Sequence, residues 1–505
     1  MMQNLKPGER FTGQMGLLER LRLQVPPPYV VSIVGAAARK TETRGPVTYE
    51  FYRRERDYGD DAVSDLKFAM RNEPFDLCLL AAVMRALPRE DLVAWIASEQ
   101  TSVFSRRAWF LYEFLTGEKL PLPDGPTVKY APLLDETLHV VGAFQWKDPR
   151  THILVNLLGV QNFCPIVRRT PKIDGLSVES LLEEIASVTR AFAPELLRRA
   201  ADFLYGKETR SSFEIERETI SENKGARFVA ALRTAEEFGS ITPDILLKIQ
   251  NIIIGDENRA ARGWRTDQNY IGETQRGFKE NVHCIFPRPA DVPSLMDGLE
   301  AMDINLDAFR IDPIVTAAIL AFSFVFIHPF EDGNGRIHRF LIHHALVRHG
   351  VTPAGGIFPI SAAMLRDPRG YDRALEAFSG RIMPFVDWRI DDDGVVTVQN
   401  DTRDLYRFFD ATAQVEYLAD VILETVRVDL RQELEYLARH DRIYPLIDER
   451  LDGVPRNKVN LLISLCLQNN GHLAKGKRRH FPMLSDEDIA DVERLIAEAE
   501  SGEQA

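Results

Sequence analysis

Twelve residues from His328 to Arg339, HPFEDGNGRIHR, combine side chains that suit chemistry on a phosphate compound. His328 supplies a base whose ordinary pKa lies near neutrality. Asp332 supplies a carboxylate oxygen of the kind that holds Mg²⁺ beside substrate phosphates. Arg336 and Arg339 add guanidinium groups that can bind phosphate bidentately. A base, a metal ligand and two phosphate-binding cations in one short segment predict an active site.

The middle of this segment predicts a binding loop for an anion. Gly333 and Gly335 flank Asn334, and glycine permits positive φ angles and a close approach to backbone N–H groups. A helix restarts behind them, and its free N-terminal N–H groups would face the same loop. Arg336 and Arg339 share a face in its first turn, where the helix dipole disfavours cations. This unfavourable placement predicts a bound phosphate as compensation.

The segment before the loop predicts a rigid support. Residues Pro313 to Ile327 are apolar nearly all round, which is typical of a fully buried helix. Pro329 disfavours helical geometry at His328, so the helix is expected to end there.

Residues 262–289, RGWRTDQNYIGETQRGFKENVHCIFPRP, interrupt the helical pattern of the rest of the chain. Glycines, short alternating apolar pieces and a closing PRP predict a β-hairpin or irregular flap among helices, with an ordinary surface loop as the alternative.

Length and composition place the motif in a large globular protein. The chain has 505 residues, 45% hydrophobic and 27% charged, which predicts two or three domains with buried cores. Apolar positions recur at helical spacing, so the fold class is mainly α. Breaks near Gly206 and at DDDGV divide the chain into a helical region 1–205, a core 206–393 and a helical region 394–505.

The charge pattern bears on nucleic acid. A net charge of −13 disfavours non-specific attraction to a phosphate backbone. A basic loop, KGKRRH, follows a helix that ends at Asn470, and Ser485 can cap the next helix. This arrangement is loosely that of a winged-helix-like module, so a DNA-binding regulator stays an alternative beside a solvated basic loop.

Cysteine and histidine spacing argues against structural metal sites and disulfides. The four cysteines are scattered singly, which fits a reducing compartment: Cys78, Cys164, Cys284 and Cys466. Zinc held by His338, His343, His344 and His349 is disfavoured, because His338 has no histidine three or four residues further on. The longest apolar stretch is shorter than the roughly 20 residues that cross a bilayer, so a cytoplasmic protein without membrane association is expected.

His328 to Arg339 resembles the signature of the Fic (filamentation induced by cAMP) family, His-x-Phe-x-[Asp/Glu]-Gly-Asn-Gly-Arg-x-x-Arg, at every defined position. GWRTDQNYIG and FPRP are similar to the hairpin flap of that family. The resemblance implies a Fic-type helical core with an inserted flap and helical flanks. The flap would dock a target peptide by strand addition through Asn269, Tyr270, Ile271 and Gly272.

The resemblance implies AMP transfer from ATP to a Ser, Thr or Tyr hydroxyl of a target protein, with self-modification as a further outcome. His328 would be the base and Asp332 the Mg²⁺ ligand. The phosphates would be bound by Gly333, Asn334, Gly335, Arg336 and Arg339, the last of them holding the γ-phosphate. Tyr371 would stack on adenine or else be a core tyrosine.

A second resemblance implies regulation. RSSFEIERETI is similar to the family's inhibitory [Ser/Thr]-x-x-x-Glu-[Gly/Asn] helix through Ser212 and Glu216, and this helix is expected at about 208–220. Glu216 would compete with the γ-phosphate for Arg339. Arg217 departs from the pattern, and an ordinary charged helix is the alternative.

Several activities stay open within the family. The kinase-like Doc branch carries lysine in place of the second glycine, and the phosphocholine-transferring branch carries alanine in place of the first. Gly333 and Gly335 therefore favour nucleotidyl transfer. UMP transfer and removal of AMP by the same site remain alternatives.

Overall fold

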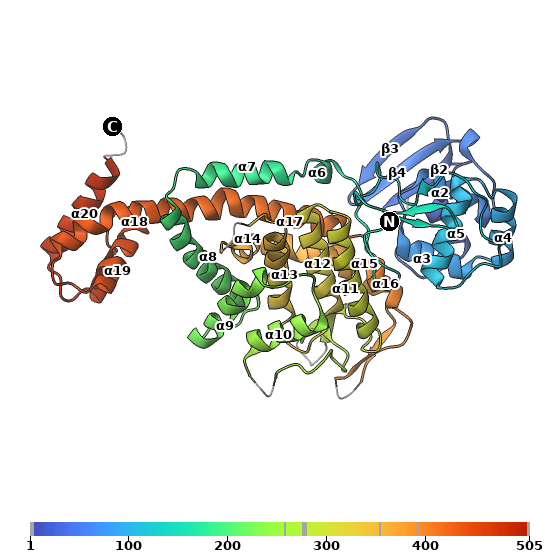
Figure 1. The fold of residues 1–505 in the computed structure, drawn as a ribbon. Coiled ribbons are helices and arrows are strands. Elements are labelled where there is room, and N and C mark those ends of the chain that lie inside the picture. The colour runs from blue at the N-terminus through green and yellow to red at the C-terminus, as the bar shows by residue number, and fades with distance from the viewer. Residues whose placement is uncertain (1–4, 257–258, 275–279, 353–354, 392–393, 502–505) are drawn as a thin grey trace.

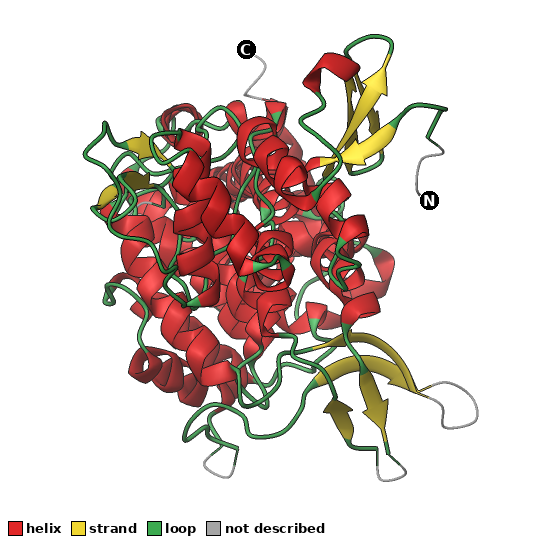
Figure 2. Cartoon of the chain, turned by 90° about the vertical axis from the view of Figure 1, so that its right-hand side faces the viewer, coloured by secondary structure: helices red, strands yellow, loops and turns green. Residues whose placement is uncertain are grey.

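Helices form most of the molecule, and short strands lie at its periphery (Figure 2). This computed structural model describes residues 5–256, 259–274, 280–352, 355–391 and 394–501. The mainly α fold class predicted from the sequence is confirmed. Within the described ranges, no helix combines the length and the apolar character needed to cross a bilayer.

The N-terminal region contains a sheet that the sequence pattern did not predict. Its four strands have the order β1-β2-β4-β3, with β2 parallel to β4. They are β1 (Arg10–Thr12), β2 (Val30–Ala36), β3 (Lys40–Arg44) and β4 (Val47–Arg53). Helices pack beside them: α1 (Gly13–Arg20), α2 (Ala62–Asn72), α3 (Leu77–Ala86), α4 (Arg89–Ser98) and α5 (Val103–Thr116). The expected helical character of residues 1–205 thus applies to only part of that region.

A smaller sheet and two helices lead from this region to the centre of the molecule. The sheet has the order β5-β7-β6. Its strands are β5 (Ala131–Pro132), β6 (Trp146–Asp148) and β7 (Ile153–Val155), and the helices are α6 (Pro171–Asp174) and α7 (Val178–Thr189).

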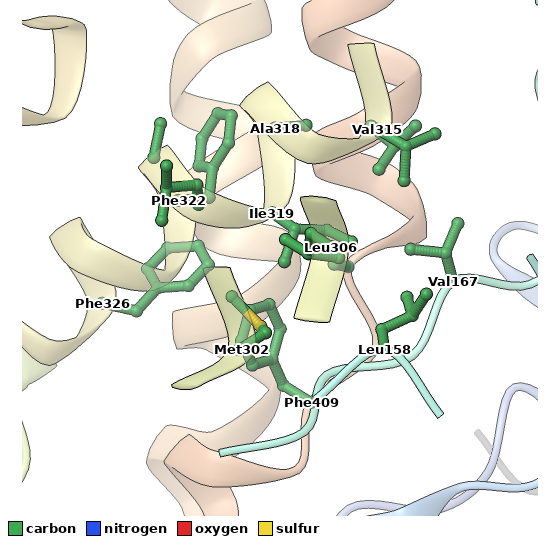
Figure 3. Packing of buried hydrophobic residues seen from close by; sticks show 14 of the residues in the cluster. Leu158, Val167, Met302, Leu306, Val315, Ala318, Ile319, Phe322, Phe326 and Phe409 are labelled. Carbon is green, nitrogen blue, oxygen red and sulfur yellow. The ribbon is translucent and has the colours of Figure 1, made fainter. Parts of the chain in front are cut away.

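The centre is a helical body built around α12 (Pro313–Ile327). Figure 3 shows Ile319 and Phe326 of α12 packed with Met302 and Leu306 of α11 and with Phe409. The surrounding helices are α8 (Pro194–Ile215), α9 (Glu222–Arg233), α10 (Pro243–Ile254), α11 (Val292–Ala308), α13 (Asn334–Arg348), α14 (Ile360–Arg366), α15 (Pro368–Ile382), α16 (Arg403–Arg407) and α17 (Thr412–Glu424). The apolar sequence of α12 therefore predicted its central place correctly.

The predicted flap is an antiparallel hairpin. It consists of β8 (Tyr270–Thr274) and β9 (Glu280–Ile285), and residues 275–279 lie outside the described ranges. A second hairpin, β10 (Trp388–Ile390) with β11 (Val396–Val398), follows the helical body.

The C-terminal helices extend away from the N-terminal region (Figure 1). A π-helical turn (Thr425–Leu430) joins α17 to α18 (Arg431–Arg450), and α19 (Arg456–Leu467) and α20 (Asp486–Ser501) pack on α18 around a separate apolar cluster. The winged-helix-like form suggested for this region is not found, because residues 431–501 contain no strand. The basic segment Lys475–His480 forms a 3-10 helix in place of a wing.

A buried carboxyl group makes the stability of the N-terminal region depend on pH. Glu73 is 3% exposed, and burial raises its pKa to about 7 from an ordinary value of 4.5. The unfolded chain releases this proton near pH 4.5 and the folded chain near pH 7, so stability falls as pH rises across that window, by up to about 3 kcal/mol. Glu73→Gln is therefore expected to raise the free energy of unfolding at pH 8 and to change little at pH 4.5. Urea unfolding at both pH values checks this, with the exposed Glu90→Gln as control. A stability gain of equal size at both pH values would contradict the assignment.

Candidate active site

The loop after α12 is closed by its own side chains. His328 ends α12 with a φ of 52°, and Gly333 precedes α13 with a φ of 90°. The Asn334 side chain donates to the carbonyl oxygen of Phe330 at 2.7 Å and accepts from the Phe330 N–H at 3.0 Å. The free N–H groups of the first turn of α13 consequently lie beside this loop, as the sequence predicted.

His328 is half-buried and neutral. Its ring stacks on Phe286 of the flap base, with 3.9 Å between ring centroids and 23° between planes. Burial, reinforced by the positive charge of Arg265, lowers the pKa of His328 to about 3. At physiological pH the imidazole is therefore uncharged and able to accept a proton.

Arg265 connects the flap to this histidine, although the sequence pattern did not predict a role for it. Its Nε donates to the His328 carbonyl oxygen at 2.7 Å, and its Nη2 donates to the Pro287 carbonyl oxygen at 2.6 Å. Burial lowers the pKa of Arg265 to about 10, so it stays charged at neutral pH. The contacts to carbonyl groups distant in sequence explain why residue spacing alone did not reveal it.

The two motif arginines are buried, and both are paired with the carboxylate of Glu216, the residue that follows α8. Arg336 is 3% exposed and Arg339 is 1% exposed. Arg339 donates to the Ser212 hydroxyl at 2.6 Å and to Glu216 Oε1 at 2.5 Å. Glu216 Oε2 lies 3.1 Å from Nε of Arg336. The structure therefore brings Ser212, Glu216 and Arg339 together as predicted, and it adds an unpredicted contact between Glu216 and Arg336.

Gly335 lies directly against the carboxylate of Glu216. A Cβ at Gly335 would lie 2.3 Å from Glu216 Oε1, which is far inside contact distance. Unlike Gly333, Gly335 does not have a positive φ. The two glycines of the loop thus serve different physical purposes.

The helix that presents Glu216 differs from the predicted range. α8 ends at Ile215 with Glu216 as its C-cap, so the predicted segment 208–220 begins inside the helix and extends past its end. Arg217 has a φ of 55°, and the N–H of Glu218 donates to the Phe213 carbonyl oxygen at 3.0 Å. This is the Schellman type of helix end, in which glycine or asparagine favours the left-handed position.

Replacing Arg217 by glycine is expected to stabilise the protein by about 1 kcal/mol, because an arginine in the left-handed region is strained. The measurement is the unfolding midpoint in denaturant. Arg22→Gly is the matched comparison, since Arg22 has a φ of 50° far from this site and should give a similar gain. A loss of stability in Arg217→Gly alone would mean that the Arg217 side chain makes a favourable contact.

A ladder of contacts sets the register of α8 on α13. Glu208, Ser212 and Glu216 are four residues apart and share one face of α8. Glu208 Oε1 lies 3.0 Å from Nε2 of His343, one turn beyond Arg339. Later positions along α8 therefore contact earlier positions along α13, as expected for antiparallel helices.

The remaining histidines of α13 and its C-terminus do not converge. His338 Nδ1 lies 2.8 Å from the Ala321 carbonyl oxygen, His344 Nδ1 lies 3.0 Å from that of Ala235, and His349 Nε2 lies 3.2 Å from Asp307. Within the described residues, no group of three or more His, Cys, Asp or Glu side chains could hold a metal ion.

Asp332 suits a metal ion that arrives with phosphates. Its carboxylate pairs with Arg259 and lies 3.3 Å from Nη2 of Arg336. It lines an open pocket of about 510 Å³ together with Gln250 and Trp264. Mg²⁺ needs one or two carboxylates and completes its shell with water and phosphate oxygens, so a single partly exposed aspartate fits it.

The predicted flap residues face different surroundings. Asn269 Nδ2 donates to the Phe330 carbonyl oxygen at 3.2 Å, which ties the flap to the loop. Tyr270 pairs with Ile285, and Ile271 is 49% exposed beside Gly272. The exposed part of the predicted docking segment is therefore Ile271.

Tyr371 is partly buried near Arg339. Its ring centroid lies 6.1 Å from those of His338 and Tyr417, and burial raises the pKa of its hydroxyl while Arg339 lowers it. It packs among aromatic side chains at the edge of the site, so both predicted roles remain compatible with its position.

Comparison with known proteins identifies the segment around this site. Residues 240–346 match the model of the Fic/DOC family. The protein adenylyltransferase Fic of Aedes aegypti is 31% identical over 147 residues, 29% of this chain and 26% of that protein. The protein of the same name from Nematostella vectensis is 29% identical over 149 residues, 29% of this chain and 31% of that protein. The chain thus spans between 26% and 31% of the length of these relatives.

A solved Fic family protein from Desulfovibrio desulfuricans G20 aligns with a TM-score of 0.38 at 20% identity, over 60% of this chain and 88% of that chain. The segment that matches the family model contains α10, the flap, α11, α12 and most of α13, and so includes the whole loop from His328 to Arg339. Residues 240–346, which carry the loop from His328 to Arg339, are therefore similar to the Fic/DOC family.

Proposed function

We propose that this protein transfers AMP from ATP to a Ser, Thr or Tyr hydroxyl of a target protein. The observation that carries the proposal is the neutral His328 imidazole beside the loop at the start of α13, where two buried arginines lie. The similarity to the two relatives, each a protein adenylyltransferase Fic, supports the same reaction. The catalytic unit would comprise residues 206–393.

In the proposed reaction, His328 accepts the proton of the target hydroxyl. The hydroxyl oxygen then forms a bond to the α-phosphorus, and the bond from that phosphorus to the bridging oxygen breaks, so pyrophosphate leaves. Lowering the pKa of His328 keeps it neutral before the substrates arrive. The negative phosphates of bound ATP would raise that pKa and so favour the protonated product state.

The phosphates would be bound by groups that converge at the start of α13. Backbone N–H groups of Gly333, Asn334 and Gly335 and the guanidinium of Arg336 would stabilise the developing charge. Arg339 would hold the γ-phosphate. Asp332 would hold Mg²⁺, which when bound neutralises phosphate charge.

The target would be docked on the flap. An extended segment of the target would pair with the hairpin near the exposed Ile271, and Tyr371 would contact the adenine ring. A segment of this chain itself could be a target in the same way, which would produce self-modification.

Parallel incubations with α-³²P-ATP and γ-³²P-ATP, each with Mg²⁺, test the reaction. AMP transfer places label on protein from the α position only, and excess unlabelled UTP should not compete. Label from the γ position would contradict the proposal and indicate a kinase. A chase of labelled protein with unlabelled ATP distinguishes AMP removal, because removal would release the label.

A further inference from the structure

Glu218, which has no place in the family signature, faces the same arginine as Glu216. Its Oε2 lies 3.4 Å from Nη1 of Arg336, and its Oε1 accepts from Lys224 at 2.6 Å. Burial acts against ionisation, but the bond from Lys224 and the charge of Arg336 hold the pKa of Glu218 below its ordinary value, so it is charged at neutral pH.

The three nitrogen atoms of the Arg336 guanidinium each face a different carboxylate. Nε lies 3.1 Å from Glu216, Nη1 lies 3.4 Å from Glu218 and Nη2 lies 3.3 Å from Asp332. A phosphate binds arginine best through two neighbouring N–H groups. Loss of Glu216 would free only Nε, and Nη1 would still be occupied.

The helix end after α8 explains how two carboxylates reach one side chain. Arg217 takes the left-handed conformation, and the N–H of Glu218 bonds back to Phe213. The chain therefore reverses between Glu216 and Glu218, and both side chains point to Arg336. Lys224 of α9 then holds Glu218 in place.

We propose that Glu218 is a second inhibitory carboxylate, which occupies Arg336 and excludes a nucleotide phosphate from it. This inference rests on the proposed function for the identity of the ligand as ATP. Relief of inhibition then requires the displacement of two carboxylates, from Arg339 and from Arg336. It also involves α9, because Lys224 anchors Glu218.

The test is the binding of Mg–ATP to the 505-residue chain carrying His328→Ala, in which turnover is expected to be too slow to disturb the titration. Glu218→Gln, Glu216→Gly and the double variant are compared by calorimetric titration. Glu218→Gln is expected to lower the Kd for ATP by about five-fold, and to lower it further in the Glu216→Gly background, since a repelling charge is removed in each case. Glu222→Gln, an exposed glutamate of α9, is the matched control and should leave the Kd unchanged.

Each outcome decides between the two proposals. An unchanged Kd for Glu218→Gln in both backgrounds, or no ATP binding by any variant, would overturn the inference. Tighter ATP binding without any label transfer by the His328-containing proteins would support the inhibitory carboxylate and reject AMP transfer. Label transfer at a rate that does not depend on Glu218 would support AMP transfer and reject the inhibitory role of Glu218. Thermal unfolding of each variant shows that the change in Kd does not come from misfolding.

Discussion

Replacement of His328 by alanine is expected to lower the rate of label transfer from α-³²P-ATP by about 10²- to 10⁴-fold, which is the usual contribution of a positioned general base. The His328 ring stacks on Phe286, and Arg265 donates to the backbone carbonyl oxygen of His328. An alanine at this position leaves no group there that could accept the hydroxyl proton. The rate is measured in the Glu216→Gly background, where inhibition does not mask the loss.

The low pKa of His328 adds a second readout. Because burial lowers the pKa to about 3, the free enzyme holds the neutral base throughout the range from pH 6 to 8. The value of kcat/KM should therefore show no inflection from His328 in that range. His472→Ala, at an exposed position between α19 and α20, is the control. Retention of transfer in His328→Ala, with normal folding, would remove the base assignment.

Local spacing was enough to predict the centre of the site. The apolar run of α12, the proline after His328 and the glycine at 333 act on their own neighbours, so the helix end and the loop follow from adjacent residues. The hairpin flap was predictable for the same reason. The pattern of Ser212 and Glu216 also placed the right carboxylate, but its helix ends earlier than expected because Arg217 adopts the left-handed conformation.

Contacts between distant segments were not predictable from spacing. Arg265 bonds to carbonyl groups that any residue could supply, so nothing in its neighbourhood distinguishes it. Glu218 reaches Arg336 only because the chain reverses at Arg217, and a reversal at a non-glycine residue carries no sequence signal. The N-terminal sheet was missed because β2 pairs with β4, which is not its neighbour in sequence, so the pairing skips β3.

The charge of the two motif arginines is offset by carboxylates of the same chain. The sequence suggested that a bound phosphate offsets two cations at the start of a helix. In the structure the offset comes from Glu216, Glu218 and Asp332. In the proposed mechanism, these carboxylates and the phosphates of bound ATP would compete for the same guanidinium groups, and the outcome of that competition would set activity.

Glu216→Gly is expected to raise label transfer between about 5- and 150-fold, the range of a typical coupling between two sites. The glutamate occupies Nη2 of Arg339 and Nε of Arg336, and its removal frees both for phosphate oxygens. Gly335 also loses the carboxylate that approaches it, so space opens beside the loop. Initial rates at several ATP concentrations are the measurement, and the increase should appear in kcat/KM.

Glu216→Gly should lower the stability of the protein, although it raises activity. Arg336 and Arg339 would remain buried with one carboxylate fewer, and buried charges that lose a partner are destabilising. Glu216→Gly is therefore expected to unfold at a lower temperature than wild type without nucleotide, and to gain more from Mg–ATP, because phosphates then supply the missing negative charge. Glu214→Gly is the matched control, since it removes an exposed glutamate from the same helix turn. If Glu214→Gly raised label transfer as much as Glu216→Gly, loosening of α8 would explain the activation, and competition for the two arginines would not.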